Sequence, residues 1–228
     1  MKTIDLSHPI HPEIPVYPGT EPPQITPANS IERDGFAEIL ISMYSHTATH
    51  IDAPCHLLPH GKSLDQFPAG HFIGTAVVID LRSRTTPEIA LKHITLFAEQ
   101  LNGVDFVLLN TGWSVHWGKA NYFEGYPYLS EEAADWLSSF PLRGVGIDTI
   151  SIDPLDSPDL PAHRQLLGND FIIIENLTNL QAVSSRCTFS CLPLPVRGAD
   201  GSPVRAVAIE NCGDSETNRG EHDHDQLF

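Results

Sequence analysis

One stretch of eleven residues, from His46 to His56, constrains this chain more than any other feature. It reads His-Thr-Ala-Thr-His-Ile-Asp-Ala-Pro-Cys-His. Three imidazoles and one carboxylate therefore lie an even number of residues apart, at His46, His50, Asp52 and His56. Imidazole nitrogen and carboxylate oxygen are the ligands that zinc and harder divalent ions such as manganese prefer. The stretch therefore predicts a metal site, and the chain must fold so that these side chains converge.

The same spacing restricts the backbone. A straight strand would hold His46 and His50 roughly 13 Å apart at about 3.3 Å per residue, whereas ligands of one metal lie within about 4 Å of each other. A helical turn would bring these histidines together but would point Asp52 away. We therefore predict a strand that breaks into a tight turn around Ala48, with Pro54 preventing a helix from continuing. The alternative is four polar side chains on a solvated strand.

Composition and charge narrow the class of protein and its partners. The 228 residues suit one large domain or two small ones, and 41% of them are hydrophobic. A formal net charge of -16 argues against nucleic acid and anionic membrane as partners. The N-terminus has no apolar run of signal-peptide length, and no apolar stretch of about 18 residues occurs elsewhere. We therefore expect a cytoplasmic protein.

The hydrophobic pattern predicts a sheet-rich α/β or α+β domain over residues 1–212 and a polar, acidic, flexible tail over 213–228. Two helices are predicted, one with Thr86 as N-cap that ends at Gly103 and one with Ser130 as N-cap. Apolar, β-branched runs predict strands over 37–45, 73–81, 104–109, 144–148, 171–174 and 204–209.

A second region offers further candidate ligands. Glu175 follows the apolar run 171–174, where a carboxylate is costly unless it is paired, hydrogen-bonded or bound to a metal. His163 lies in a segment that contains proline and is predicted to be a loop, and loops often carry binding residues. Each alone is compatible with an ordinary core or surface residue, but beside the first motif they could complete the metal site. Tyr17 and Trp113 are candidates for an aromatic wall of the substrate pocket.

The His46–His56 stretch resembles the H-x-G-T-H-x-D-x-P-x-H signature of the metal-dependent cyclase-like hydrolases, which include bacterial kynurenine formamidases and isatin hydrolases. Further similar segments extend over nearly the whole chain, at 5–10, 17–19, 111–113, 148–153, 160–163 and 201–206. The resemblance implies a swivelling β/β/α fold, assembled as a homodimer or homotetramer, with a zinc or manganese site.

The resemblance also implies a role for each residue of the site. The metal ligands it implies are His46, His50, Asp52, His163 and Glu175. Asp52 and Glu175 would bridge two metal ions, and His56 would be the general acid/base. A glutamate at 175, where isatin-hydrolase-like relatives carry glutamine and bind one manganese, favours the two-metal, formamidase-like branch.

Two positions depart from the family pattern. Ala48 replaces the usual glycine, so a turn that needs positive φ would be strained there by roughly 1 kcal/mol. Tyr17 stands where formamidases tend to carry a tryptophan in the substrate pocket. The second departure bears on the substrate and not on the hydrolytic chemistry.

The predicted function is a metal-dependent hydrolase of C–N bonds other than peptide bonds, acting on an aryl formamide such as N-formylkynurenine. A metal-activated hydroxide would attack the carbonyl, with His56 as general acid/base. The alternatives are hydrolysis of a lactam or lactone, and a cyclase or dehydratase acting on a polyketide-type substrate. A non-catalytic scaffold stabilised by metal is disfavoured, because structural zinc sites are closed and usually rich in cysteine.

Overall fold

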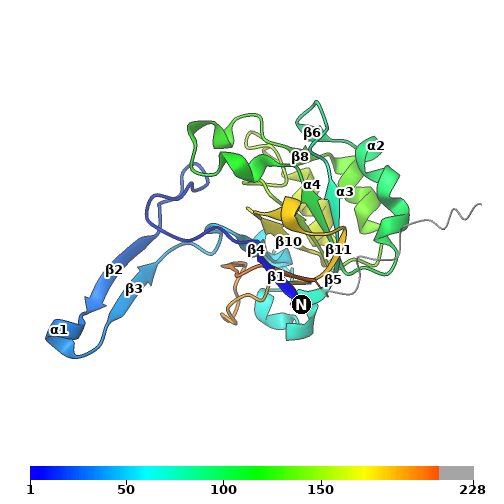
Figure 1. Cartoon of the computed structure of the whole chain (residues 1–228). Coiled ribbons are helices and arrows are strands. Elements are labelled where there is room, and N and C mark those ends of the chain that lie inside the picture. Colours follow the sequence, from blue (N-terminus) through cyan, green and yellow to red (C-terminus); the bar gives the residue numbers. More distant parts are fainter. Residues whose placement is uncertain (211–228) are drawn as a thin grey trace, which may run out of the picture.

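The structure, a computed structural model, describes residues 1–210. The predicted tail over 213–228 and the domain boundary at residue 212 lie outside them. One curled sheet of nine strands dominates the fold (Figure 1). In spatial order the strands are β1 (Lys2–Asp5), β13 (Val207–Glu210), β11 (Arg186–Ser190), β5 (Ile73–Asp80), β7 (Phe106–Asn110), β9 (Gly144–Ile147), β10 (Ile172–Glu175), β4 (His50–Asp52) and β12 (Gly201–Pro203).

Parallel pairing is confined to the middle of this sheet. Strands β5, β7, β9 and β10 run parallel to one another, and they are the short apolar runs that are typical of buried strands. On one side β11, β13 and β1 pair antiparallel, and on the other side β4 and β12 do so. The strands predicted over 73–81, 104–109, 144–148 and 171–174 are thus confirmed with small shifts at their ends, and β13 confirms the second half of 204–209.

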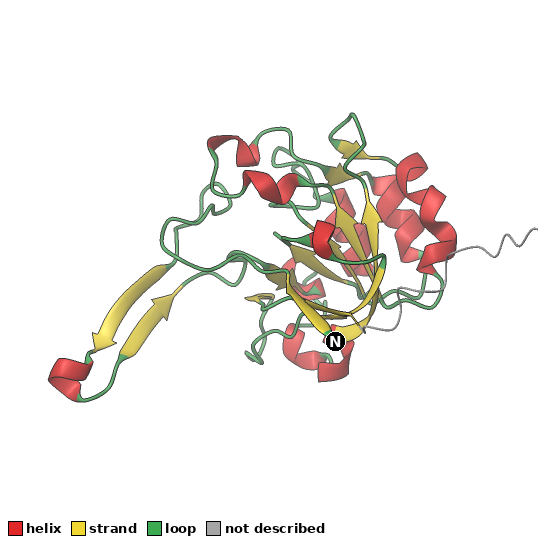
Figure 2. Cartoon of the chain, viewed as in Figure 1, coloured by secondary structure: helices red, strands yellow, loops and turns green. Residues whose placement is uncertain are grey.

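Each face of the sheet packs against a separate apolar core. Helices α3 (Glu131–Ser138) and α4 (Pro161–Gly168) cover one face (Figure 2), and the core beneath them includes Val145 and Ile173. Because side chains alternate along a strand, Phe106 and Ile172 point to the other face and its own core. The chain is therefore the sheet-rich α/β fold that the sequence predicts. Within residues 1–210 no helix combines the length and apolar character needed to cross a membrane.

The helix predicted from Thr86 to Gly103 is wrong at its start, and the segment is helical only from Leu91 to Leu101. Strand β6 (Glu88–Ile89) occupies its start and pairs in parallel with β8 (Tyr128–Leu129), so the backbone there is extended. A short helix, α2 (Leu91–Ile94), and a 3-10 helix follow. The Thr86 hydroxyl donates to a carbonyl oxygen within the strand and caps no helix. Strand pairing thus outweighs the weak helical periodicity of this segment.

Helix α3 begins at its predicted N-cap, Ser130, whereas α4 forms where a loop is predicted. Pro161 occupies the first position of α4, where its missing N–H costs nothing. The Asp153 carboxylate caps the helix, with its oxygens 3.0 Å from the Ala162 nitrogen and 2.9 Å from the His163 nitrogen. Because this cap comes from outside the segment, no N-cap residue directly before the helix announces it. His163 is therefore fixed in the first turn of a helix, and the prediction that it lies in a loop is wrong.

Strands β2 (Gln24–Asn29) and β3 (Glu38–Ser42) form a hairpin that projects away from the rest of the molecule (Figures 1 and 2). A short helix, α1 (Ile31–Asp34), lies at its tip. The strand predicted over 37–45 is confirmed as β3, but every residue of β3 is exposed. We call residues 24–42 the arm.

Candidate metal centre

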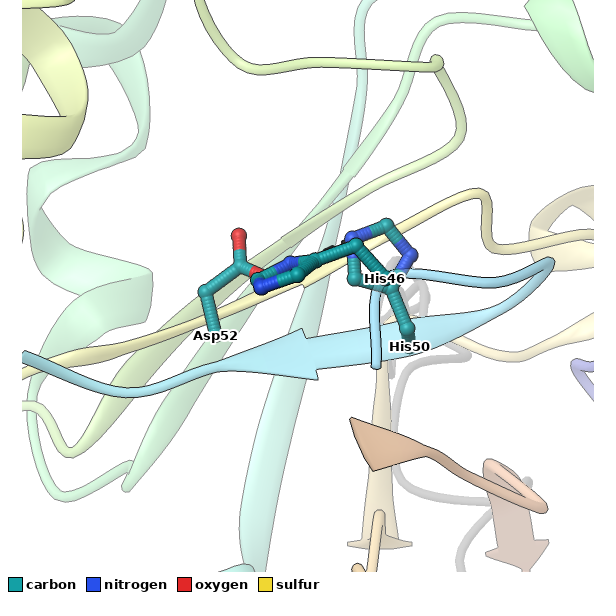
Figure 3. A group of neighbouring side chains, drawn as sticks. All are labelled: His46, His50 and Asp52. Atoms are coloured by element: carbon teal, nitrogen blue, oxygen red, sulfur yellow. Dashed lines mark hydrogen bonds and ion pairs between the residues drawn. The ribbon is translucent and has the colours of Figure 1, made fainter. Parts of the chain in front are cut away.

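The His46–His56 stretch reverses direction where the sequence predicts a turn. Ala48 adopts a left-handed conformation with φ of 55°, and strand β4 begins two residues later. As a result the ring centroids of His46 and His50 lie 5.1 Å apart, and both rings approach Asp52 (Figure 3). Pro54 starts a 3-10 helix over Pro54–His56, which places His56 beside His46. The predicted break around Ala48 is confirmed.

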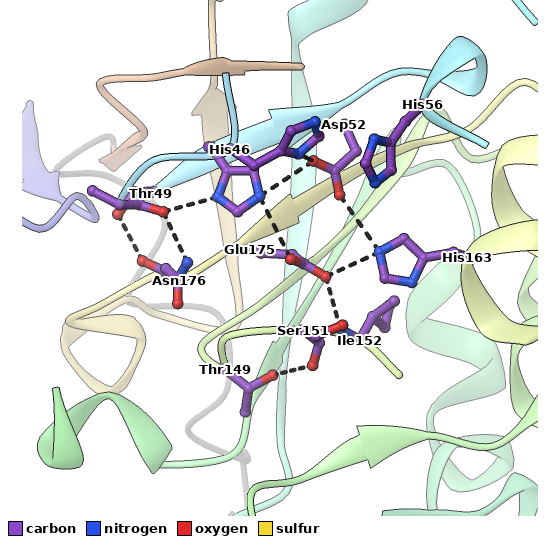
Figure 4. A network of polar contacts seen from close by, with 12 residues as sticks. His46, Thr49, Asp52, His56, Thr149, Ser151, Ile152, His163, Glu175 and Asn176 are labelled. Carbon is purple, nitrogen blue, oxygen red and sulfur yellow. Dashed lines mark hydrogen bonds and ion pairs between the residues drawn. The ribbon is translucent and has the colours of Figure 1, made fainter. Parts of the chain in front are cut away.

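Strand β10 and helix α4 bring two more ligand groups to the same place. Glu175 pairs directly with His50 across the β10–β4 ladder, so its side chain lies on the face that α4 covers. The Nε2 atom of His163 lies 3.3 Å from Glu175 Oε1 and 3.6 Å from Asp52 Oδ2 (Figure 4). On the other side, His50 Nε2 lies 3.2 Å from Asp52 Oδ1 and 3.5 Å from Glu175 Oε2. The structure thus brings together all five residues predicted as ligands.

These side chains form two groups whose ligand atoms lie within 4.8 Å of one another. The two groups are His46 with His50 and Asp52, and Asp52 with His163 and Glu175. Except for His46, all of these residues are buried. Two buried carboxylates in contact with imidazole nitrogens would be costly in an apolar interior without protons or metal between them. The donor set therefore fits a divalent metal ion, with Asp52 common to both groups.

Hydrogen bonds behind the ligands fix how they are presented, as is usual for metal-binding histidines. His163 Nδ1 lies 2.7 Å from Asp153 Oδ2, and His50 Nδ1 lies 2.8 Å from the carbonyl oxygen of Ala48. A carbonyl oxygen only accepts, so His50 carries hydrogen on Nδ1 and turns Nε2 toward the carboxylates. The side-chain amide of Asn176 donates to the same Ala48 oxygen at 2.8 Å, which holds the strained turn against the end of β10 (Figure 4).

Charges within the cluster set the protonation of the histidines. Burial opposes a charge on His46, but Asp52 together with a hydrogen bond to Asp200 outweighs it and raises the pKa of His46 to about 10. Burial also opposes a charge on His163, yet hydrogen bonds to Asp153, Asp52 and Glu175 raise the pKa of His163 well above its ordinary value. Burial alone would raise the pKa of Asp52, but its histidine neighbours hold it well below the ordinary range. Without metal, His46 and His163 therefore carry protons.

Metal binding must displace these protons, so we expect the affinity for metal to rise with pH. Because the pKa of His46 is about 10, the competition persists up to that pH. We expect up to roughly a tenfold gain in affinity per pH unit for each proton displaced. Competition with a chelator of known affinity between pH 6.5 and 9 measures this gain. A metal affinity that is independent of pH over this range would show that metal binding displaces no protons from these histidines.

A cavity of about 350 Å³ opens above the cluster. Its lining includes the five candidate ligands and His56, together with Tyr17, Ile150 and Leu160. Tyr17 therefore lies where a substrate-binding residue is expected. Trp113, the other predicted aromatic, does not line this cavity: it packs in a neighbouring cluster, and its indole N–H donates to the Tyr122 carbonyl oxygen at 2.9 Å.

The sequence prediction misses three polar residues that contact the centre: Asp153, Asn176 and Asp200. Asp153 lies within the segment 148–153, which carries the family resemblance, so the sequence does contain a signal that this residue belongs to the site. Asn176 directly follows Glu175 and adopts a left-handed φ of 56°, which asparagine tolerates. Asp200 lies in the turn predicted before the last strand, and nothing in that turn signals its approach to His46.

Gly201 shapes the site by lacking a side chain. A Cβ atom there would lie 2.6 Å from His46 Cε1, which is closer than real contacts allow. We expect Gly201→Ala to displace the His46 ring and to weaken metal binding by roughly 10- to 100-fold, as for other changes around metal ligands. Gly70→Ala is the matched control, because a Cβ atom at Gly70 meets nothing within 4 Å. Equal metal affinity of the two variants would contradict this role of Gly201.

Comparison with known proteins agrees with the fold. A family model described as a putative cyclase matches residues 4–154. A kynurenine formamidase from Bacillus thuringiensis (strain Al Hakam) is 37% identical over 212 residues, which cover 91% of this chain and 98% of that protein. Isatin hydrolase A from Labrenzia aggregata, bound to benzyl benzoate, has a TM-score of 0.81 at 28% identity and covers 91% of this chain and 93% of its own. A potential metal-dependent hydrolase with cyclase activity has a TM-score of 0.76 at 28% identity, with 91% and 96% covered. The family match over most of the chain, together with a fold and a ligand cluster of the expected kind, shows that this chain belongs to the putative cyclase family.

Proposed function

We propose that this chain is a metal-dependent hydrolase that cleaves a non-peptide C–N bond, and that its substrate is an aryl formamide such as N-formylkynurenine. The observation that carries the proposal is a buried cluster of histidines and carboxylates that opens into a cavity with His56 on its wall. The 37% identity to a kynurenine formamidase over nearly the whole chain supports the choice of substrate.

The proposed ligands divide into two sets around Asp52. His46, His50 and Asp52 would hold one divalent ion, zinc or manganese, and Asp52 with His163 and Glu175 would hold a second. A divalent metal held there lowers the pKa of a bound water and polarises a carbonyl oxygen. The protein's part is to present two buried carboxylates and three oriented imidazoles, and to leave the cavity side open for the substrate.

His56 is proposed as the general acid/base. It lies outside both buried ligand groups, lines the cavity, and its side chain keeps 28% of its surface exposed. Burial lowers the pKa of His56, and the charges of His46 and His163 act in the same direction, against the attraction of Asp52. The ring is therefore neutral at physiological pH. It can accept a proton from water and return it to the leaving nitrogen.

The substrate's aryl group would lie against the apolar side of the cavity. Tyr17, Ile150 and Leu160 are among the residues that line it. Tyr17 is 38% exposed, so its ring is available to stack on a bound aromatic group. These residues would fix the orientation of the substrate, so that the substrate carbonyl points to the ligand cluster.

Hydrolysis of N-formylkynurenine by metal-loaded protein, with chelator-treated protein as blank, tests the proposal. Turnover that chelation abolishes and metal restores is expected. Isatin, a lactam, is the comparison substrate, because a solved isatin hydrolase shares the fold with a TM-score of 0.81. Hydrolysis of isatin without hydrolysis of the formamide, by protein shown to retain metal, would replace the formamidase proposal with a lactam hydrolase. Cyclisation of a polyketide-type substrate is the remaining alternative.

We also propose that the protein is a homodimer or homotetramer, with the arm as part of the contact between copies. The arm exposes a group of large apolar side chains: Ile31, Phe36, Ile39, Leu40 and Ile41. A two-stranded hairpin with both faces exposed is marginally stable in water, and exposed apolar patches of this kind mark interaction sites.

No nucleic acid or membrane is proposed as a partner. The buried free thiols of Cys187 and Cys191 support a cytoplasmic location.

A charge in the arm tests this assembly. We expect the Leu40→Glu variant to be monomeric, because the new carboxylate would lose its hydration in the contact. Molar mass from light scattering during size-exclusion chromatography measures the change. Leu96→Glu is the matched control, since Leu96 is 81% exposed but lies outside the arm. A variant that keeps the wild-type molar mass would show that the arm is not part of the contact.

A further inference from the structure

We propose that Asp200 is a positioning residue that acts through two histidines, His46 and His56, and so links the metal centre to the general acid/base. The inference deepens the proposed function and rests on it. Asp200 belongs to neither buried ligand group, and it lines the cavity from the loop before β12.

One carboxylate oxygen of Asp200 faces both rings. Its Oδ2 atom lies 3.0 Å from His46 Nε2 and 3.4 Å from His56 Nδ1, and the ring centroids of the two histidines lie 4.1 Å apart. The other oxygen, Oδ1, accepts a hydrogen bond from the Ser45 hydroxyl at 3.0 Å. Both oxygens are therefore engaged, and the carboxylate has a fixed orientation.

The main chain around Asp200 is held by the sheet. The carbonyl oxygen of Asp200 accepts the Ala53 amide hydrogen at 2.8 Å, and Gly201 pairs with Asp52 in the β12–β4 ladder. Gly201 also lets the His46 ring approach closely, since any Cβ atom there would overlap the ring. Asp200 is thus placed by the same edge of the sheet that places the ligands.

The contact with His46 selects which ring nitrogen is free for metal. A carboxylate at neutral pH only accepts hydrogen bonds, so His46 must carry hydrogen on Nε2. Its Nδ1 atom faces Asp52 Oδ1 at 2.7 Å inside the buried ligand group, so without metal it also carries hydrogen, and this is the proton that a bound metal would displace. A carboxylate behind a ligand histidine fixes the ring and raises its basicity. Asp200 therefore prepares His46 for metal binding.

The contact with His56 acts on the proposed proton transfer in the same way. Hydrogen on Nδ1 of His56 would point to Asp200, which leaves Nε2 as the atom that exchanges protons in the cavity. Because one oxygen serves both rings, a change at Asp200 alters metal affinity and turnover together.

The three residues also form a group whose ligand atoms lie within 4.8 Å of one another. An additional metal held by His46, His56 and Asp200 is the competing interpretation. All three residues are partly exposed, and His46 already belongs to the buried group. We favour the positioning role, and metal stoichiometry separates the two.

The test combines Asp200→Asn with His56→Ala and uses two measurements. Chelator competition gives metal affinity without any substrate, and kcat is measured at saturating metal. We expect Asp200→Asn to weaken metal binding by roughly 10- to 100-fold at unchanged stoichiometry. It should lower kcat about tenfold or more in the wild-type background and have little further effect when His56 is alanine. Asp200→Glu should recover part of both losses.

Asp65→Asn is the matched control. Its carboxylate accepts the Gly198 amide hydrogen at 2.8 Å and so touches the same loop, but no histidine of the centre. We expect its metal affinity and kcat to equal those of the wild type, which separates positioning from general loosening of the loop.

Three results would overturn the proposal. Unchanged metal affinity in Asp200→Asn would remove the role toward His46. An equal loss of kcat with and without His56 would remove the role toward His56, and the loss of one bound metal per chain would make Asp200 a ligand. Failure of the proposed function looks different: wild-type protein would bind metal tightly, Asp200→Asn would bind it weakly, and neither would hydrolyse a formamide.

Discussion

Asp52→Asn is expected to reduce kcat/KM by at least about 10,000-fold, because one carboxylate serves both ligand groups. Its two oxygens face different histidines: Oδ1 lies beside His46 and His50, and Oδ2 lies beside His163. An amide cannot replace a bridging carboxylate, since its nitrogen donates hydrogen and lacks the negative charge. Without metal, water keeps a pKa near 15.7 in place of about 7, so little hydroxide forms at neutral pH and the expected loss is large.

Metal content by mass spectrometry, measured beside activity, tests this expectation. The variant should retain its fold but bind less metal than the wild type. Asp80→Asn is the matched control: Asp80 ends strand β5, which is separated from β4 by three other strands, is exposed, and pairs with Arg82 at the surface. A variant of Asp52 with full metal content and more than about one-hundredth of wild-type activity would contradict the shared role of this carboxylate.

The parts of the site that the sequence predicts are those encoded by local geometry. The spacing of His46, His50 and Asp52 is incompatible with a straight strand or a helix, and this leaves a turn around Ala48 as the solution. The structure has that turn, with φ of 55° at a residue that is not glycine. The strands of the parallel centre are predictable for a similar reason, because strands buried on both faces must be apolar throughout.

What the sequence prediction misses depends on residues far apart in the chain. Helix α4 takes its cap from Asp153, outside its own segment, so a local search for an N-cap finds nothing. Asp200 lies 154 residues from His46 along the chain, and only the pairing of β12 with β4 brings them together. The incorrect start of the helix predicted after Thr86 has the same origin, since that segment pairs with β8. Tertiary pairing decides each of these cases.

The centre itself is assembled in the same two ways. One local turn brings His46, His50 and Asp52 together. Glu175 is placed by the register between β10 and β4, and His163 is placed by the cap that Asp153 provides for α4. The first group can be recognised from spacing alone. The second group requires that β10 lie beside β4, because a shift by one residue would turn Glu175 to the opposite face.

His56→Ala is expected to lower kcat by a hundredfold or more while metal content stays near that of the wild type. General acid/base catalysis by a positioned side chain contributes factors of about 100 to 10,000, and His56 stands outside both buried ligand groups. The pH profile adds an independent criterion. Because burial lowers the pKa of His56, the wild type should lose activity only as pH falls below the ordinary histidine range, and the alanine variant should lack that step.

His60→Ala is the matched control, because His60 is exposed and lies four residues further along the chain. It should keep wild-type turnover and the wild-type pH profile. A His56→Ala variant that loses metal in proportion to its activity would show instead that His56 is a ligand. The group of His46, His56 and Asp200 would then be a metal site, and the proton transfer would need another residue on the cavity wall. Unchanged metal with a missing acidic step would leave His56 as the group that moves the proton.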